Sequence, residues 1–139
     1  MAEKFRAQIF VRWSDQDING HVNNARVATL LEEARIKWRR HAASVGTAAD
    51  LETTTLVASL TLHYRRPIGF GHAVDVDIWV VRIGARSYTM GYAGYQNGHL
   101  VLDASTVMVS LDDATGRARG LDVGERNYLK RYFCAEVPV

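Results

Sequence analysis

The chain has little cysteine and no long apolar run, the features that mark disulfide-bonded secreted proteins and membrane proteins. It contains one cysteine, Cys134, so no internal disulfide can form, which favours a reduced, cytosolic setting. No apolar run approaches the roughly 20 residues that a membrane-spanning helix needs. The first residues, Met1 to Arg6, lack the apolar core of a signal peptide. The sequence therefore predicts a cytoplasmic protein with no membrane partner.

The excess of positive over negative residues is also small. Seventeen Lys and Arg against fifteen Asp and Glu leave a net charge of +2, too small to indicate a nucleic-acid partner. Most of the positive residues are arginine, which suits phosphate binding but also follows from coding preference. A length of 139 residues, 47% of them hydrophobic and 23% charged, predicts a single globular domain over 1–139.

One segment near the N-terminal end of the chain has the period of a helix, and it follows a strand. Alternating apolar residues predict a strand over Phe5 to Trp13. A helix is expected to begin near Asn23 or Asn24 and to stop at Gly46, followed by a loop over 46–55. Its apolar stripe, at steps of three and four, consists of Val27, Leu31, Ala34, Trp38 and Ala42.

The rest of the chain alternates with the period of strands, expected over 56–64, 74–80, 87–96 and 100–111. Asn97-Gly98 predicts a tight hairpin, and glycines 91 and 94 inside a strand indicate a bend or a close approach. Asp122 and Glu125 have the spacing of a capping box before a short helix over 126–133. The pattern predicts an α+β protein in which an antiparallel sheet covers one long helix.

The densest group of functional side chains is WSDQDINGHVNNA, residues 13–25. Its carboxylates, Asp15 and Asp17, lie in a loop that opens the long helix. A carboxylate there is a base or nucleophile beside unpaired backbone N–H groups, which suits attack on a carbonyl whose oxygen becomes an oxyanion. From the residues alone, however, Asp17 is more simply a turn aspartate that accepts backbone hydrogen bonds.

The whole pattern resembles a known family. Asp-x-Asp-x-x-Gly-His-Val-Asn-Asn over 15–24, Glu-Glu-Ala-Arg over 32–35 and Tyr-Arg-Arg-Pro-Ile over 64–68 resemble the 4-hydroxybenzoyl-CoA thioesterase-like branch of the hotdog-fold acyl-CoA thioesterases. The resemblance implies a five-stranded antiparallel sheet wrapped around one helix. It also implies dimers joined edge to edge and often paired into tetramers, with active sites between subunits. The implied reaction converts an acyl-CoA into a carboxylic acid and coenzyme A, without metal or cofactor.

The same resemblance implies roles for residues of the loop and the helix start. Asp17 becomes the catalytic carboxylate, as general base or nucleophile, and the backbone N–H of Asn24 polarises the thioester carbonyl. His21 is a third catalytic candidate, although bracing the loop is its simpler role. A metal site of His21 with Asp15 and Asp17 would need convergent ligand geometry that the sequence does not supply. Asn23 is expected to cap the helix and is also a candidate substrate contact.

The resemblance implies that Arg86 and Ser87 lie where the family often contacts coenzyme A. Arg65 is a further candidate for this contact, because guanidinium groups match phosphate oxygens. Family helices often carry aromatic residues where this chain has Val27 and Leu30, so the expected acyl pocket is less aromatic. Two alternatives stay open. An acyl-carrier-protein thioesterase would dock an acidic protein on the arginines, and a non-catalytic acyl-CoA-binding hotdog module would lack the carboxylate that Asp17 supplies.

Overall fold

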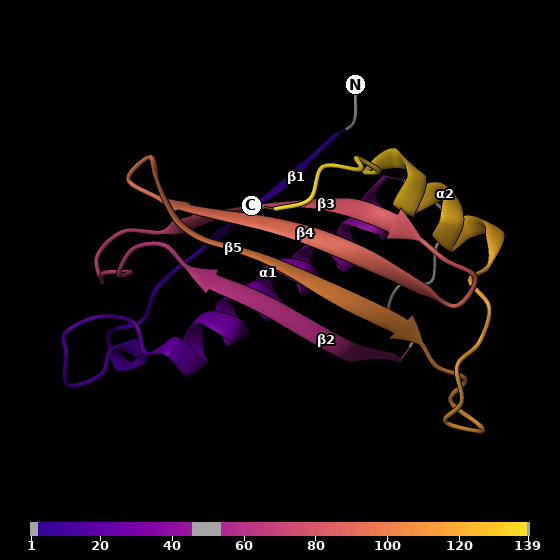
Figure 1. The fold of residues 1–139 in the computed structure, drawn as a ribbon, viewed down its shortest axis with the longest axis horizontal. Helices are drawn as coiled ribbons and strands as arrows, with labels where there is room; N and C mark the ends of the chain where they lie inside the picture. Colours follow the sequence, from indigo (N-terminus) through magenta and orange to yellow (C-terminus); the bar gives the residue numbers. More distant parts are fainter. Residues whose placement is uncertain (1–2, 46–53, 139) are drawn as a thin grey trace.

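The computed structural model describes residues 3–45 and 54–138. Its strands form one antiparallel sheet in the order β1-β3-β4-β5-β2, and α1 crosses behind this sheet in Figure 1. The elements are β1 (Phe5–Ile9), η1 (Trp13–Asp15), α1 (Asn24–Ser44), β2 (Thr55–Tyr64), β3 (Val74–Ile83), β4 (Ser87–Gln96), β5 (His99–Ser110) and α2 (Val123–Arg131). This arrangement confirms the predicted α+β architecture.

The core lies between the sheet and α1. All five residues of the predicted helical stripe are buried, and Trp38 is fully enclosed. Trp38 also joins α1 to α2, since its ring lies 5.1 Å from that of Tyr128, whose hydroxyl donates to the Trp38 carbonyl at 2.6 Å. Alternate residues of the strands face the same core, as the two-residue period requires. No helix in the described ranges is long and apolar enough to span a membrane.

The start of α1 is fixed by the predicted cap. The Asn23 side chain accepts a hydrogen bond from the Ala25 N–H at 2.9 Å, and Val22 and Val27 are both buried around the helix entry. The last helical residue is Ser44. The predicted stop at Gly46 lies outside the described residues, as does the expected loop up to residue 53, while Thr55 already belongs to β2.

Several predicted boundaries were wrong, and β3 runs to Ile83, three residues past its expected end at 80. The first strand ends at Ile9 rather than Trp13, because the Asp15 carboxylate accepts a hydrogen bond from the Arg12 N–H and turns the chain into η1. Trp13 is consequently 74% exposed. The second helix starts at Val123 rather than 126, because Asp122 caps it directly and the Asp122–Glu125 capping box is present as predicted.

Glycines mark close approaches and the hairpin as expected. A Cβ on Gly91 would lie 2.6 Å from the Trp79 ring, and one on Gly94 would lie 2.7 Å from Leu102. The Trp79 Nε1–H donates in turn to the Glu136 carbonyl at 2.7 Å, which ties the C-terminal segment to the sheet. Between β4 and β5, residues 97 and 98 both have positive φ, which confirms the predicted turn.

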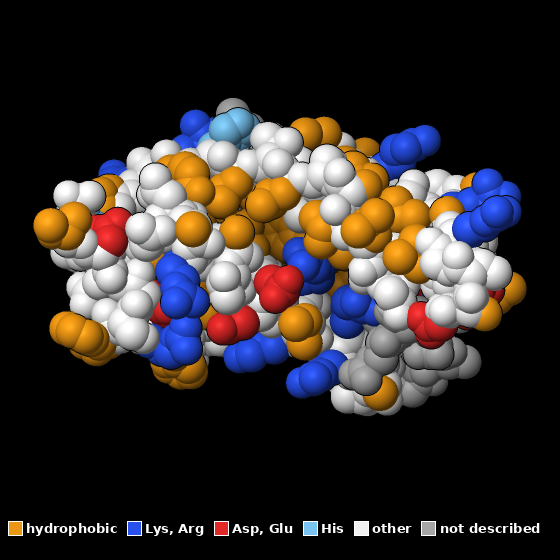
Figure 2. Space-filling view, turned by 90° about the horizontal axis from the view of Figure 1, so that it is seen from below, with side chains coloured by type: hydrophobic (Ala, Val, Ile, Leu, Met, Phe, Trp, Pro, Cys, Tyr) orange, Lys and Arg blue, Asp and Glu red, His pale blue; other side chains and the backbone are white. Residues whose placement is uncertain are grey.

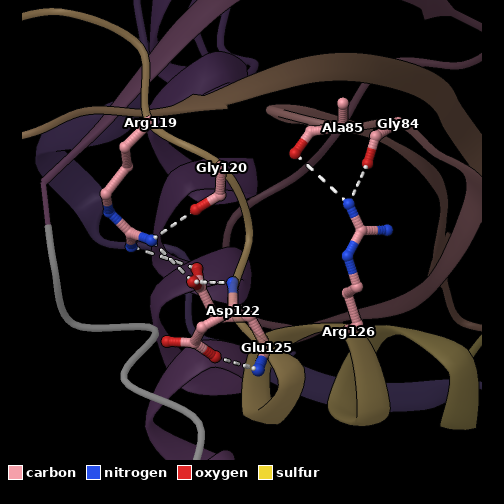
Figure 3. A network of polar contacts seen from close by, with 7 residues as sticks. All are labelled: Gly84, Ala85, Arg119, Gly120, Asp122, Glu125 and Arg126. Atoms are coloured by element: carbon pink, nitrogen blue, oxygen red, sulfur yellow. Dashed lines mark hydrogen bonds and ion pairs between the residues drawn. The ribbon is translucent and has the colours of Figure 1, made fainter.

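A polar network fastens α2 to the rest of the fold (Figure 3). Glu125, 1% exposed, accepts from the Arg119 guanidinium at 2.7 and 3.2 Å and from the Asp122 N–H at 3.1 Å. Arg126 donates to the carbonyls of Gly84 and Ala85, in the turn before β4. These bonds hold α2 against the strand ends, and Arg119 is the main charge that compensates the buried Glu125 carboxylate.

We expect Arg119→Met to lower the free energy of unfolding by about 2 kcal/mol, because it leaves a buried carboxylate without its cation. The partial exposure of Arg119 keeps this loss below that of a fully buried pair. Urea unfolding at neutral pH measures it. Arg117→Met, at an exposed position two residues earlier, is the matched control and should change little. Equal stability of the two variants would contradict this account of Glu125.

Candidate functional site

A tight loop carries the central residues of the site to the start of α1. The Gly20 N–H donates to the Asp17 carbonyl at 3.0 Å, and the Asp17 N–H donates to the His21 carbonyl at 2.9 Å. Gly20 has a φ of +78°, a conformation that glycine adopts without strain. The Val22 N–H then bonds to the Ile68 carbonyl at 2.9 Å, which pins the loop to the segment after β2. These backbone bonds close the loop on itself and attach it to the segment after β2.

The Asp17 carboxylate is held through both of its oxygens. Oδ1 accepts the Asn19 N–H at 2.9 Å, the local turn contact expected of an aspartate here. Oδ2 accepts the Asn23 side-chain amide at 3.2 Å. Because Asn23 is also the N-cap of α1, one side chain fixes both the helix start and the orientation of the carboxylate.

Asn24, the first residue of α1, lines the same pocket as Asp17. Among the described residues, no group accepts a hydrogen bond from the Asn24 N–H, as is usual for the first turn of a helix. The Asn24 carbonyl accepts instead from the Tyr64 hydroxyl at 3.0 Å, so the end of β2 clamps the helix start. A donor without a partner, at the positive end of a helix dipole, is suited to stabilising a developing negative charge.

These groups line one open pocket of about 310 Å³. It combines the carboxylate and the helix start with an apolar wall and two arginines. The lining residues are Asp17, Asn19, His21, Val22, Asn24, Val27, Tyr64, Arg65, Arg66, Pro67 and Ile68. The predicted residues Asp17, His21, Asn24 and Arg65 thus share one cavity, with Asn23 directly behind it.

Asp15 has a different environment from Asp17. It is 3% exposed and accepts hydrogen bonds from the Arg12 N–H at 2.8 Å and the Arg12 guanidinium at 3.0 Å. Burial acts to raise the pKa of Asp15, but the bonds from Arg12 outweigh it and hold that pKa below its usual value. The Asp15 carbonyl also accepts the Asn23 N–H at 2.9 Å. Asp15 therefore anchors the loop and does not line the pocket.

His21 braces the loop through its carbonyl, while its exposed ring faces the pocket and has no hydrogen bond to another described residue. Over residues 3–45 and 54–138 no group of three His, Cys, Asp or Glu side chains could hold a metal ion.

Arg86 and Ser87 lie far from this pocket within one chain. Ser87 is the first residue of β4 and pairs with Val109, and Arg86 directly precedes it, whereas the pocket lies at the Tyr64 end of β2. Along β2 the two ends are separated by nine residues, or roughly 30 Å. A single chain does not bring these two candidates to Asp17.

The sequence reasoning missed two contacts at the site. The strand pattern over 56–64 does not predict that the Tyr64 hydroxyl bonds to the helix start. Asp103 was not singled out, although it is buried against Arg65. Its signal was a lone carboxylate within the apolar run Leu100 to Leu102 and Ala104.

The fold and the site together define a hotdog protein with a carboxylate beside a helix start. The profile of the Thioesterase-like superfamily matches residues 11–126. The chain belongs to this superfamily.

Individual relatives agree with this assignment. Long-chain acyl-CoA thioesterase FadM from Escherichia coli (strain K12) is 27% identical over 128 residues, which cover 91% of this chain and 97% of that protein. A thioesterase from Thermus thermophilus, crystallised with coenzyme A and Zn, is 31% identical, with a TM-score of 0.78 over 90% of this chain and 96% of the other. A predicted thioesterase from Bacillus stearothermophilus matches the fold with a TM-score of 0.84 at 23% identity, over 99% and 100% of the two chains.

The environment of Asp15 predicts acid sensitivity. Because its folded pKa lies below the unfolded value of about 3.9, Asp15 contributes stability above that value and loses it as the pH falls through the folded pKa. We expect Asp15→Asn to lower the free energy of unfolding at pH 7 by about 1 to 3 kcal/mol. The difference from wild type should shrink near pH 3. Urea unfolding at both pH values tests this, with the exposed Asp113→Asn as control, and a difference independent of pH would contradict it.

Proposed function

We propose that this protein hydrolyses acyl-CoA thioesters to a carboxylic acid and coenzyme A. The observation that carries the proposal is that Asp17 and Asn24 line one pocket, while Asn23 donates to the Asp17 carboxylate and caps the helix by accepting the Ala25 N–H. Membership of the thioesterase-like superfamily supports the same reaction. The likeness to a thioesterase that was crystallised with coenzyme A supports the substrate class.

In the proposed mechanism, Asp17 either removes a proton from the attacking water or attacks the carbonyl carbon itself. The carbonyl oxygen gains negative charge in both cases and accepts the Asn24 N–H, a type of contact worth about 3 kcal/mol per donor in the transition state. Asn23 holds the carboxylate in place while the helix dipole adds positive potential. The thiolate of coenzyme A leaves readily, so the reaction needs no strong general acid.

The proposed acyl site is aliphatic near the reacting carbon. Val22, Val27 and Ile68 form its apolar wall, and Tyr64 supplies the aromatic ring of that lining. Arg65 and Arg66 lie on the polar side, where phosphates of coenzyme A would find guanidinium partners. This division of the pocket fits an aliphatic acyl group joined to an anionic carrier.

The central test is Asp17→Asn. The amide keeps the size of the side chain and can still bond within the loop, but it is neither an effective base nor a nucleophile at neutral pH. We expect kcat for acyl-CoA hydrolysis to fall on the order of 10² to 10⁴. The melting temperature should change little. Release of thiol from a series of acyl-CoA thioesters, with the matching carrier-protein thioesters beside them, measures both activity and preference.

Asp15→Asn is the matched control, since it changes a neighbouring carboxylate that points away from the pocket. It should lose stability but keep more activity than Asp17→Asn. Full turnover in the Asp17 variant, with an inactive but folded Asp15 variant, would show that the wrong carboxylate was assigned. Full activity in both would defeat the mechanism.

We also propose that the active form is a homo-oligomer built on the β2 edge. Both end strands of the sheet are edges, but β1 has five residues and β2 has ten. Leu56 and Leu60 on β2 are 51% and 43% exposed, and Val57 and Tyr64 are also exposed. Figure 2 looks toward this edge and shows hydrophobic side chains gathered across it. A long apolar edge strand favours pairing with a second chain.

Such pairing would also explain the two distant candidates. If two copies join β2 to β2 in antiparallel sense, the end at which β4 starts in one copy approaches the Tyr64 end of the other. Arg86 and Ser87 of a second copy would then lie on the side of this pocket. A dimer of dimers would need a second, different contact, because this pairing uses the one free β2 edge of each chain.

We expect Leu60→Glu to convert the assembly into monomers, because it places a charge in the middle of the apolar edge. The rate of acyl-CoA hydrolysis by this variant should fall together with the molecular mass of the assembly. Light scattering coupled to size-exclusion chromatography at micromolar concentration gives the mass. Gln8→Glu, on the short β1 edge, is the control and should leave the assembly intact. A monomeric wild type with full activity would contradict the proposed assembly.

A further inference from the structure

The two flanks of α1 face opposite edges of the sheet. On one flank, the Lys37 ammonium donates to the Gln8 carbonyl of β1 at 3.0 Å. On the other flank, the Arg39 guanidinium donates to the Thr55 hydroxyl of β2 at 2.9 Å. Residues at steps of three or four along a helix lie on the same flank. The residues that precede Arg39 at these steps therefore face the β2 edge, and this group is called the β2 flank of α1.

The β2 flank contains a buried cation, Arg35, which follows Glu32 by three residues. Arg35 is 8% exposed. Its Nη1 donates to the Tyr92 hydroxyl at the long distance of 3.5 Å, and its Nη2 lies 3.7 Å from the Glu32 carboxylate, too far for a hydrogen bond. The Tyr92 hydroxyl is also hydrogen-bonded to Thr106 at 2.8 Å. Within the described part of the chain, the five N–H donors of this guanidinium thus share one long hydrogen bond.

Arg35 and Glu32 lie near the middle of the β2 edge, on the helix side of the sheet. Thr106, which shares the polar contacts of Arg35, is paired with Leu60 of β2, and directly paired residues point to the same face. Leu60 is 43% exposed because β2 has no neighbour on its other side. The helix passes obliquely behind this part of the sheet (Figure 1), from one end of β2 at its first turn to the other end at Arg39. The two charges therefore lie between the ends of an exposed apolar edge.

We propose that Glu32 of one copy pairs with Arg35 of the other, reciprocally, across the two-fold axis of a β2-edge dimer. The inference rests on the assembly that forms part of the proposed function, and it does not depend on the reaction. Antiparallel pairing of β2 with β2 over its full length puts the axis near the middle of both strands, and so brings the β2 flanks of the two helices together in antiparallel order. A carboxylate and a guanidinium one turn apart on such a flank are self-complementary, since each meets its opposite on the second copy.

The charges of these two elements leave Glu32 as the carboxylate that can serve Arg35 in this interface. The acidic residues of α1 and β2 are Glu32 and Glu33, and Glu33 lies four residues before Lys37, on the β1 flank. The Glu32 side chain is 60% exposed in one chain and so is available to a second copy. Figure 2 shows acidic and basic side chains meeting in a hollow of this face, among hydrophobic ones. A second copy would remove the remaining water from Arg35, which makes a close ion pair necessary there.

The main test reverses the two charges in separate chains. Glu32→Arg surrounds the axis of its own dimer with cations alone, and Arg35→Glu surrounds it with carboxylates alone. We expect the dissociation constant of each variant dimer to rise about tenfold or more. In a mixture, the two variants place opposite charges across the axis, so heterodimers should outnumber both homodimers. Native mass spectrometry, with a mass tag on one variant, counts the three species. An ion pair that acts only within one chain gives a mixture without this preference, and that result would overturn the proposal.

A variant at the exposed partner keeps the proposal testable if Arg35→Glu does not fold. Glu32→Gln should raise the dissociation constant of the dimer about tenfold, because both reciprocal pairs are lost. Glu33→Gln, the neighbouring change on the β1 flank, is the matched control and should leave this constant unchanged. Light scattering over a dilution series measures both. Equal constants for the two variants would overturn the ion pair and leave the edge assembly standing. A monomeric wild type would overturn the assembly itself, so the two failures are distinguishable.

Discussion

The side chain of Asn23 links the fold to the chemistry proposed for this protein. Its oxygen caps α1 by accepting the Ala25 N–H, and its amide donates to Asp17. An asparagine can do both because it carries an acceptor and two donors on one planar group. Aspartate or serine would cap the helix equally well, but an ionised aspartate could not donate to Asp17. The position of the helix and the aim of the carboxylate are therefore set by the same side chain.

The rest of the architecture maintains that arrangement. The buried stripe of α1 holds the helix against the sheet, and Tyr64 and Ile68 tie its first turn to the end of β2. At the other end of the helix, Trp38 packs on α2, which is itself held by Arg119 and Glu125. Packed elements thus surround a loop that is closed by its own backbone hydrogen bonds, and the fold itself holds the geometry of the candidate site.

The fold could be predicted from sequence because its signals are local. The stripe of α1, the Asn23 cap, the 97–98 hairpin and the Asp122–Glu125 box each depend on residues close together in the chain. Which candidate residues share the pocket could be predicted only where a motif gathers them in one loop. The Asp103–Arg65 contact joins positions 38 residues apart and has no local pattern. The early end of β1 was missed because the bonds of Asp15 to Arg12 compete with the strand period.

The contact between Gly91 and Trp79 has a consequence for the C-terminal end of the chain. The indole occupies the space above Gly91 that any Cβ would need, and from there its N–H reaches the Glu136 carbonyl. Even an alanine at 91 would displace the ring, and with it the anchor of the segment beyond α2. Because Gly91, in the middle of β4, has no side chain, it leaves the space that the Trp79 ring occupies. The position of the segment beyond α2 therefore depends on a glycine that lies more than forty residues earlier in the chain.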